Sequence, residues 1–360
     1  MNKIIAFILI LACTCSLHAG NKQFDTMVIF GDSLSDNGNL YRYMWNKLPL
    51  SPPYYAGRFS NGPLWIERLY DSYYQEDYRE GFQDYAVGGA GAVLSYKENL
   101  PYTLTFELNN YLYWHTYGKK ETSLYTIWIG ANNYLNGPTN VESITDSVVA
   151  AIGNVVERII GYGGNKFFLV NLPDLGRIPQ ARDMKLQPLL TQLVDLHNQK
   201  LSLLVNALRQ KYPDVIFIYF DVHSIFKAAL DHPSDFGLSN VEDSCYLGSY
   251  TGWLLPFKPD DELLFSFLKQ QDKRFDTKQW DIIRNNPVLR EAALVSFTHT
   301  LLPYTYQAKE LNCEGFLFWD RVHPTATTHS YIAQKARELL DESGIEAVFA
   351  ETKPESTALL

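Results

Sequence analysis

The chain has 360 residues, of which 46% are apolar, 14% aromatic and 20% charged, and its formal net charge is −9. This composition excludes an intrinsically disordered or collagen-like chain, and the length suffices for one large domain or two smaller ones. A nucleic-acid partner is not expected, because 40 acidic residues outnumber 31 basic ones and phosphate binding needs clustered Lys and Arg.

The first residues have the order of a secretory signal peptide. Lys3 precedes an apolar run from Ile4 to Ala12, and small and polar residues follow it. We therefore predict a signal peptide over residues 1–19, with export to the periplasm or the extracellular space. The run is too short to span a bilayer as a helix. An alternative interpretation makes Cys13 the lipidated N-terminus of an anchored lipoprotein.

After residue 24, short apolar runs alternate with longer amphipathic stretches. The runs are rich in Ile, Val and Phe, which is typical of parallel strands covered on both faces. They are residues 27–30, 124–129, 166–171, 215–220 and 315–319. Helical spacing of apolar residues is found over 62–74, 103–117, 141–161 and 185–211. The alternation predicts an α/β fold, a three-layer α/β/α sandwich with a central parallel sheet.

One segment is too long for a connection within such a sheet. Residues 246–312 interrupt the order just before the last apolar run, and Cys245 and Cys313 stand at its two ends. Removal of the leader leaves these two cysteines, which are expected to form a disulfide in an oxidising compartment. We predict one domain over 20–345 with a disulfide-bounded helical insertion, and a mobile tail over 346–360.

A polar loop follows the first predicted strand, and loops after strands are where an open parallel sheet places its site. This loop reads GDSLSD (31–36) and presents Ser33 as a candidate nucleophile. It differs from the Gly-x-Ser-x-Gly elbow of α/β-hydrolases. A phosphate-binding loop is disfavoured because Asp32 and Asp36 would repel phosphate. Taken alone, the loop would be interpreted as a polar turn.

The last predicted strand runs into a second polar loop, in which Asp320 and His323 lie three residues apart. In a tight turn, this spacing lets the carboxylate accept a hydrogen bond from one imidazole nitrogen. The other nitrogen can then take the proton of Ser33, which a serine needs to lose in order to attack an acyl carbon. His329 is a weaker candidate, because it falls inside the following helix.

Two further loops offer N–H donors for the negative oxygen of a tetrahedral intermediate. One contains Gly88 and Gly89, where glycine lets a backbone N–H approach a ligand. The other follows residues 124–129 and contains Asn132 with its side-chain amide. Each loop by itself is an ordinary turn. Four such loops in order along one sheet predict an acyl-transfer site.

These loops resemble the four sequence blocks of the GDSL lipase/esterase family, also called SGNH hydrolases, which implies a flavodoxin-like fold. The resemblance implies that the catalytic residues are Ser33, Asp320 and His323, and that the oxyanion hole is formed by Ser33, Gly89 and Asn132. Gly88 is the alternative register for Gly89. Asn133 replaces the Asp of the usual Gly-x-Asn-Asp block, which affects only a supporting contact. This chemistry requires no metal or cofactor.

Residues 57–63 and 171–176 make the chain similar to one branch of the family, the secreted bacterial phospholipases A, lysophospholipases, thermolabile haemolysins and glycerophospholipid:cholesterol acyltransferases. The resemblance implies a secreted ester hydrolase that releases fatty acids from phospholipids or lysophospholipids during transient contact with a membrane surface. One alternative is acyl transfer to a sterol at the same site. The other is a non-catalytic lipid- or glycan-binding protein.

The insertion over 246–312 is either a lid that an activating protease opens or a stabilising appendage.

Overall fold

The computed structural model describes residues 22–74, 79–94, 102–135, 137–248, 260–286, 289–290, 293, 297 and 311–348. The predicted signal peptide, with Cys13, lies outside the described residues. In the part of the chain that is described, no helix combines the length and the apolar character needed to cross a membrane.

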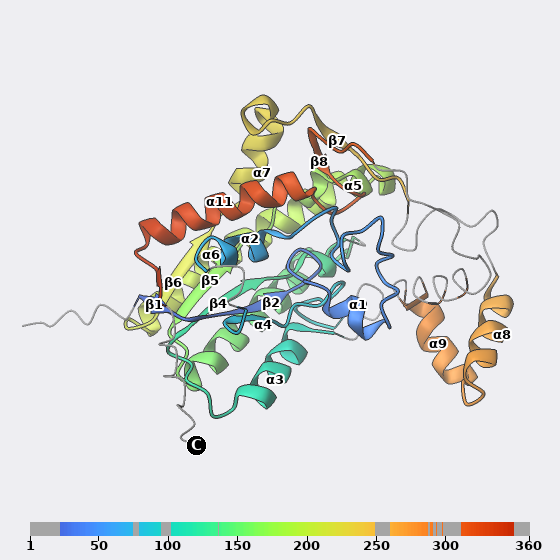
Figure 1. Ribbon diagram of the computed structural model, residues 1–360, viewed down its shortest axis with the longest axis horizontal. Helices are drawn as coiled ribbons and strands as arrows, with labels where there is room; N and C mark the ends of the chain where they lie inside the picture. The colour runs from blue at the N-terminus through green and yellow to red at the C-terminus, as the bar shows by residue number, and fades with distance from the viewer. Residues whose placement is uncertain are drawn as a thin grey trace, which may run out of the picture.

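A five-stranded parallel sheet forms the centre of the molecule, in the order β3-β2-β4-β5-β6 (Figure 1). Its strands are β2 Thr26–Gly31, β3 Phe82–Asp84, β4 Ser123–Trp128, β5 Lys166–Val170 and β6 Ile216–Phe220. Every residue of β4 and β5 is buried, as expected for strands that are covered on both faces.

Helices lie on both sides of this sheet, with α2 and α11 on one side and α3 and α4 on the other (Figure 1). The helices around the sheet are α1 Asn39–Tyr43, α2 Trp65–Asp71, α3 Leu104–His115, α4 Val141–Gly161, α5 Pro179–Met184, α6 Gln187–Lys211, α7 Val222–Asp231 and α11 Ala326–Glu342. Short 3-10 turns occur at η1 Ala131–Asn133, η2 Leu175–Arg177 and η3 Pro233–Phe236. The predicted three-layer α/β/α sandwich is confirmed.

The last predicted strand does not join the central sheet. β8 Phe316–Phe318 pairs in parallel with β7 Asn240–Ser244 in a separate two-stranded sheet. The predicted disulfide between Cys245 and Cys313 is confirmed, with the two Cα atoms 5.6 Å apart. It joins the end of β7 to the chain just before β8, and so holds these strands side by side.

A second short sheet joins the two ends of the described chain. β1 Gln23–Phe24 pairs in parallel with β9 Glu346–Ala347, and the N–H of Val348 donates to the carbonyl of Phe24. The expected start of the tail at residue 346 is therefore corrected, because residues 346–348 hydrogen-bond to β1. Residues 349–360 lie outside the described residues.

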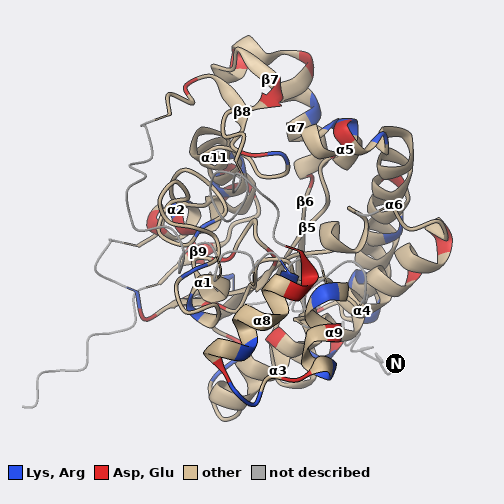
Figure 2. Cartoon of the chain, turned by 90° about the vertical axis from the view of Figure 1, so that its right-hand side faces the viewer, with Lys and Arg blue, Asp and Glu red and all other residues tan. Residues whose placement is uncertain are grey.

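The described part of the insertion contains α8 Asp261–Gln271 and α9 Thr277–Asn285. These helices enclose an apolar cluster of their own, separate from the main core and formed by Leu264, Phe267, Phe275, Trp280 and Phe297. In Figure 1 they lie beyond the carboxyl ends of the central strands, on the side of α1. Figure 2 shows Lys, Arg, Asp and Glu interspersed on this face.

Candidate active site

Ser33 and His323 meet at the carboxyl end of β2, although 290 residues separate them in the sequence. The Ser33 Oγ lies 2.7 Å from the His323 Nε2. The other ring nitrogen, Nδ1, lies 2.8 Å from Asp320 Oδ2 and 3.0 Å from its Oδ1. All three residues are buried, with exposed fractions of 8%, 3% and 2% for Ser33, His323 and Asp320. The carboxylate therefore holds a proton on Nδ1, which leaves Nε2 to accept the serine proton.

The Asp-x-x-His spacing folds into a tight turn after β8. Asp320 Oδ1 accepts the backbone N–H groups of Val322 and His323, both at 2.8 Å. The N–H of Trp319 donates to the carbonyl of His323 and closes the turn. The hydroxyl of Tyr54 donates to Asp320 Oδ2 at 2.7 Å. Sequence reasoning missed Tyr54, since nothing in its sequence position marks a contact 266 residues away.

These contacts set the charge of Asp320. Burial raises the pKa of a carboxyl group, but here the charge and the hydrogen bond of His323, with the backbone N–H donors, outweigh burial and hold the pKa of Asp320 below its ordinary value. Asp320 is therefore ionised at neutral pH, and an ionised carboxylate stabilises the imidazolium that forms when His323 takes a proton.

The nucleophile loop is a tight turn around Asp32. The N–H of Leu34 donates to Asp32 Oδ1, and the N–H groups of Ser35 and Asp36 donate to the Asp32 carbonyl. Gly31 is required where β2 enters the turn, because a Cβ there would lie 2.6 Å from the carbonyl oxygen of Trp128. Burial raises the pKa of Asp32 to about 6. The turn thus presents Ser33 to His323.

The carboxylate of Asp36 joins the nucleophile loop to the loop after β3. It accepts four backbone N–H groups, those of Gly38, Asn39, Leu40 and Gly88. The side-chain amide of Asn39 in turn donates to the carbonyls of Asp84 and Ala86. The two loops that carry Ser33 and Gly89 are therefore held together by one buried acid and one amide.

The predicted oxyanion donors differ in their hydrogen bonding. Gly88 gives its N–H to Asp36 Oδ2 at 2.6 Å. Gly89 has a φ of 77°, and its N–H makes no hydrogen bond within the described part of the chain. Asn132 donates from Nδ2 to the carbonyl of Ala90 at 2.9 Å, which uses one of its two amide hydrogens. This pattern favours the Gly89 register over Gly88, because only the Gly89 N–H stays available.

Asn133 stabilises the loop after β3 through two hydrogen bonds. Its side chain is fully buried, accepts the N–H of Ala92 at 2.8 Å and donates to the carbonyl of Val93 at 2.9 Å. An aspartate could not make the second contact, because an ionised carboxylate has no donor. The replacement in the third block therefore affects a contact that supports the loop after β3.

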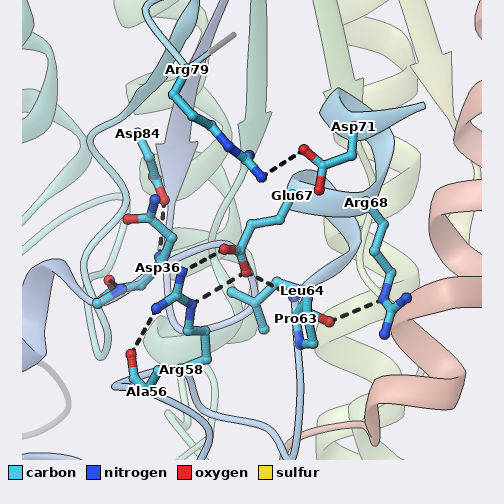
Figure 3. Close-up of polar contacts among 12 residues, drawn as sticks. Asp36, Ala56, Arg58, Pro63, Leu64, Glu67, Arg68, Asp71, Arg79 and Asp84 are labelled. Carbon is cyan, nitrogen blue, oxygen red and sulfur yellow. Dashed lines mark hydrogen bonds and ion pairs between the residues drawn. The ribbon is translucent and has the colours of Figure 1, made fainter. Parts of the chain in front are cut away.

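Residues 57–63 pack over the histidine. The ring of Phe59 lies 5.1 Å from that of His323, and the hydroxyl of Ser60 donates to the carbonyl of Pro324. Figure 3 shows how this segment is held: Arg58 donates to the carbonyl of Ala56 and forms an ion pair with Glu67. The segment thus covers one side of the imidazole.

A buried carboxyl group lies behind the nucleophile loop on α3. Glu107 Oε2 accepts the N–H of Gly31 at 2.9 Å, and Glu107 Oε1 has no partner in the described part of the chain. Burial, together with the neighbouring Asp84 and Asp32, raises the pKa of Glu107 well above its ordinary value. The sequence analysis missed Glu107, because nothing in its position within the predicted helix over 103–117 indicates a contact with Gly31.

A narrow, mostly apolar cleft with a free volume of about 30 Å³ opens beside Ser33, Asn132 and His323. Its apolar walls come from the loops after β4, β5 and β8 and from α7, and include Leu135, Leu175, Ile178, Phe226, Phe318 and Val322. A wider groove elsewhere runs past Arg177 and Asp195, and none of Ser33, Asp320 and His323 lines it.

A buried serine in contact with a histidine–aspartate pair, at this end of a three-layer α/β/α fold, is the arrangement of enzymes in which a serine attacks an acyl carbon. A family model described as GDSL-like lipase/acylhydrolase matches residues 27–336, and the chain belongs to that family. The predicted resemblance is thereby confirmed.

Curated relatives extend along most of the chain. A phosphatidylcholine-sterol acyltransferase of Aeromonas hydrophila is 34% identical over 340 residues, which cover 92% of this chain and 95% of that protein. A thermolabile hemolysin of Vibrio parahaemolyticus is 24% identical over 88% of this chain and 64% of its own length. A GDSL esterase/lipase of Arabidopsis thaliana is 27% identical over 63% of this chain and 71% of its own. The family thus includes proteins named for hydrolysis and for acyl transfer.

Proposed function

We propose that this chain is a secreted serine ester hydrolase that releases fatty acids from phospholipids or lysophospholipids. The observation that carries the proposal is the 2.7 Å contact between Ser33 Oγ and His323 Nε2, with Asp320 on the other ring nitrogen. The apolar cleft beside Ser33 and the lipase family support a lipid as the substrate.

In the first half of the reaction, Ser33 Oγ attacks the carbonyl carbon of the ester and its proton passes to His323 Nε2. The negative oxygen of the tetrahedral intermediate is held by the N–H groups of Ser33 and Gly89 and by the second amide hydrogen of Asn132. The C–O bond to the alcohol then breaks, and His323 returns the proton to the departing oxygen. The acyl group stays on Ser33.

In the second half, His323 takes a proton from water, and the resulting hydroxide oxygen attacks the acyl carbon. The bond to Ser33 Oγ breaks and the serine recovers its proton from His323. Asp320 remains ionised throughout and stabilises each imidazolium. Free fatty acid and regenerated Ser33 are the products.

A fluorophosphonate probe tests the nucleophile. The wild type should be labelled, whereas Ser33→Ala should not be. Ser35→Ala is the matched control from the same loop, since within the described part of the chain the Ser35 hydroxyl contacts Trp65 Nε1, at 3.2 Å, and makes no hydrogen bond to His323. Equal labelling of the wild type and Ser33→Ala would remove the nucleophile assignment. A lipid panel that reports free fatty acids and head-group products then identifies the substrate.

Acyl transfer to a sterol is the second candidate, and the relative named phosphatidylcholine-sterol acyltransferase favours it. The two activities share the first half-reaction and differ in whether water or a sterol hydroxyl attacks the acyl group. Product analysis with and without added sterol separates them. Sterol ester formed in proportion to lost free fatty acid supports transfer, and an unchanged fatty-acid yield supports hydrolysis.

The insertion over 246–312 is proposed as a lid. Its α8 and α9 have an apolar cluster separate from the main core, and the Cys245–Cys313 disulfide joins its ends. Such a segment can move without unfolding the α/β domain. Cleavage within it by a protease should raise turnover of long-chain substrates. Unchanged turnover of both short- and long-chain substrates after cleavage would make it a stabilising appendage.

Export is proposed from residues 1–19. Mass spectrometry of the protein recovered outside the cytoplasm should show a mature N-terminus near residue 20. A mature chain that begins with a lipid-modified Cys13 would instead support the anchored lipoprotein.

A further inference from the structure

Two apolar cavities share a single lining residue. The inner cavity is the cleft beside Ser33, and the outer cavity, a small one of about 20 Å³, lies between α7 and α11. The outer cavity is lined by residues such as Ile225, Ala229, Phe236, Tyr331 and Ile332. Among the described residues, Phe226 alone lines both cavities. Phe226 is 7% exposed and lies between the two cavities.

The inner cleft runs across the strands in one direction from Ser33. Its walls come successively from the loop after β4, with Leu135, the loop after β5, with Leu175 and Ile178, and α7 after β6. Neighbouring strands lie about 4.8 Å apart, so the distance from β2 to β6 is roughly 14 Å. Gly89 follows β3, on the opposite side of β2. An ester with its carbonyl at Ser33 can therefore lay its acyl chain along the cleft toward Phe226.

We infer that this cleft holds the acyl chain and that the ring of Phe226 forms its end wall, which sets the longest chain accepted. This inference rests on the proposed function. A chain that reaches the ring has no further apolar space in the inner cavity. If the ring is shortened, the volume that it vacates connects the cleft to the outer cavity and can take additional carbons.

The backbone that carries Phe226 is fixed independently of its ring. Asp221 caps the start of α7 by accepting the N–H of Ser224, and Asn171 accepts the N–H of His223 at 2.9 Å. Neither contact involves the Phe226 side chain. Substitutions at Phe226 therefore change the cavity wall while the start of α7 stays in place.

The test measures kcat/KM on p-nitrophenyl butyrate, octanoate, laurate and palmitate in the same mixed micelles. Phe226→Ala should raise the ratio of palmitate to octanoate turnover by about tenfold, a change of the size that small differences in an apolar pocket produce. Phe226→Leu should raise the ratio less. Phe226→Trp extends the wall into the cleft and should lower the ratio.

Phe236→Ala is the matched control. Phe236 lines only the outer cavity and packs on Tyr331 with ring centroids 4.4 Å apart. The control should leave the ratio of palmitate to octanoate turnover unchanged, because the wall at Phe226 stays in place.

The outcomes separate the inference from the function on which it rests. If the wild type turns over esters and the Phe226 variants have its chain-length ratio, the end wall is wrong and the esterase stands. A uniform loss at all chain lengths, with a lower Tm, assigns Phe226 a purely structural role. If the wild type turns over no ester of any length, the proposed function itself fails.

Discussion

The carboxyl groups on the two sides of the site have pKa values that are shifted in opposite directions. On the nucleophile side, burial raises the pKa of four acids, Asp32, Asp36, Asp84 and Glu107. On the histidine side, Asp320 is equally buried and its pKa is lowered. The two sides thus contain the same chemical group with pKa values shifted in opposite directions.

The comparison shows what sets the charge of a buried acid. Asp36 accepts four backbone N–H groups, and its pKa is raised nevertheless. Asp320 accepts two backbone N–H groups and the Tyr54 hydroxyl, and it also contacts an imidazole that can become a cation. The partner that can carry positive charge makes the difference, because backbone dipoles alone do not compensate for lost hydration.

The largest expected effect comes from neutralising Asp320. Asp320→Asn should lower kcat by about 10⁴-fold, because an amide stabilises the wrong tautomer of His323 and no imidazolium. The matched control is Asp183→Asn. Asp183 is an exposed acid on α5 that pairs with Arg321, a residue of the turn that contains Asp320. Ester kinetics on both purified variants check this. A decrease in kcat of less than tenfold in Asp320→Asn would show that its charge is dispensable.

On the nucleophile side, Asp36→Ala should act mainly through structure. It leaves four backbone N–H groups without their acceptor, and each buried unpaired group costs about 1–3 kcal/mol. We expect the free energy of unfolding to fall by about 3–5 kcal/mol, reduced by local rearrangement, and kcat to fall with it. Urea denaturation measures the loss. Asp36→Asn keeps one acceptor oxygen, so its free energy of unfolding should lie between those of the wild type and Asp36→Ala.

Glu107→Gln should change how stability depends on pH. The pKa of Glu107 is higher in the folded state than in the unfolded state, so the folded wild type binds more protons than the unfolded chain. The wild type therefore loses stability as the pH rises from about 5 toward the folded-state pKa. The slope is at most about 1.4 kcal/mol per pH unit. The variant keeps a neutral acceptor for Gly31 and lacks this loss. Thermal melts should therefore show a flatter pH profile in Glu107→Gln, and parallel profiles would contradict a raised pKa.

The smallest effect is expected for Tyr54→Phe. Loss of the hydroxyl removes one donor from Asp320, and we expect kcat to fall about tenfold, since a hydrogen bond to a charged group contributes about 1.5 kcal/mol. The ring stays packed against Trp319 and Tyr246, so the Tm should change little. A fall in Tm without a change in kcat would assign Tyr54 to packing alone.

Much of the fold and the candidate site was predictable because the signals are local. Apolar runs predicted the strands β2, β4, β5 and β6, and each predicted end lies within one residue of the observed end. The contact between Asp320 and His323 follows from a three-residue spacing within one turn. The sequence also predicted that Ser33 and His323 meet, although it assigned both to loops along one sheet, whereas β8 lies in a separate two-stranded sheet. Their catalytic roles are predictions, which the comparison of probe labelling and ester turnover between the wild type and Ser33→Ala tests.

Other features depended on contacts that no local pattern contains. The pairing of β8 with β7 rather than with the central sheet arises from the disulfide and from the path of the chain after α7. Tyr54 reaches Asp320 across 266 residues, and Glu107 reaches Gly31 across 76. The position of Phe226 between two cavities depends on how α7 packs beside α11. The sequence by itself determined four of the five central strands, the longer helices that flank them and the short-range turn at Asp320, because backbone geometry and apolar spacing act over a few residues. The tertiary structure alone decided which buried groups stand next to one another, and hence their charge and the length of the cleft, because packing and electrostatics depend on distance in space.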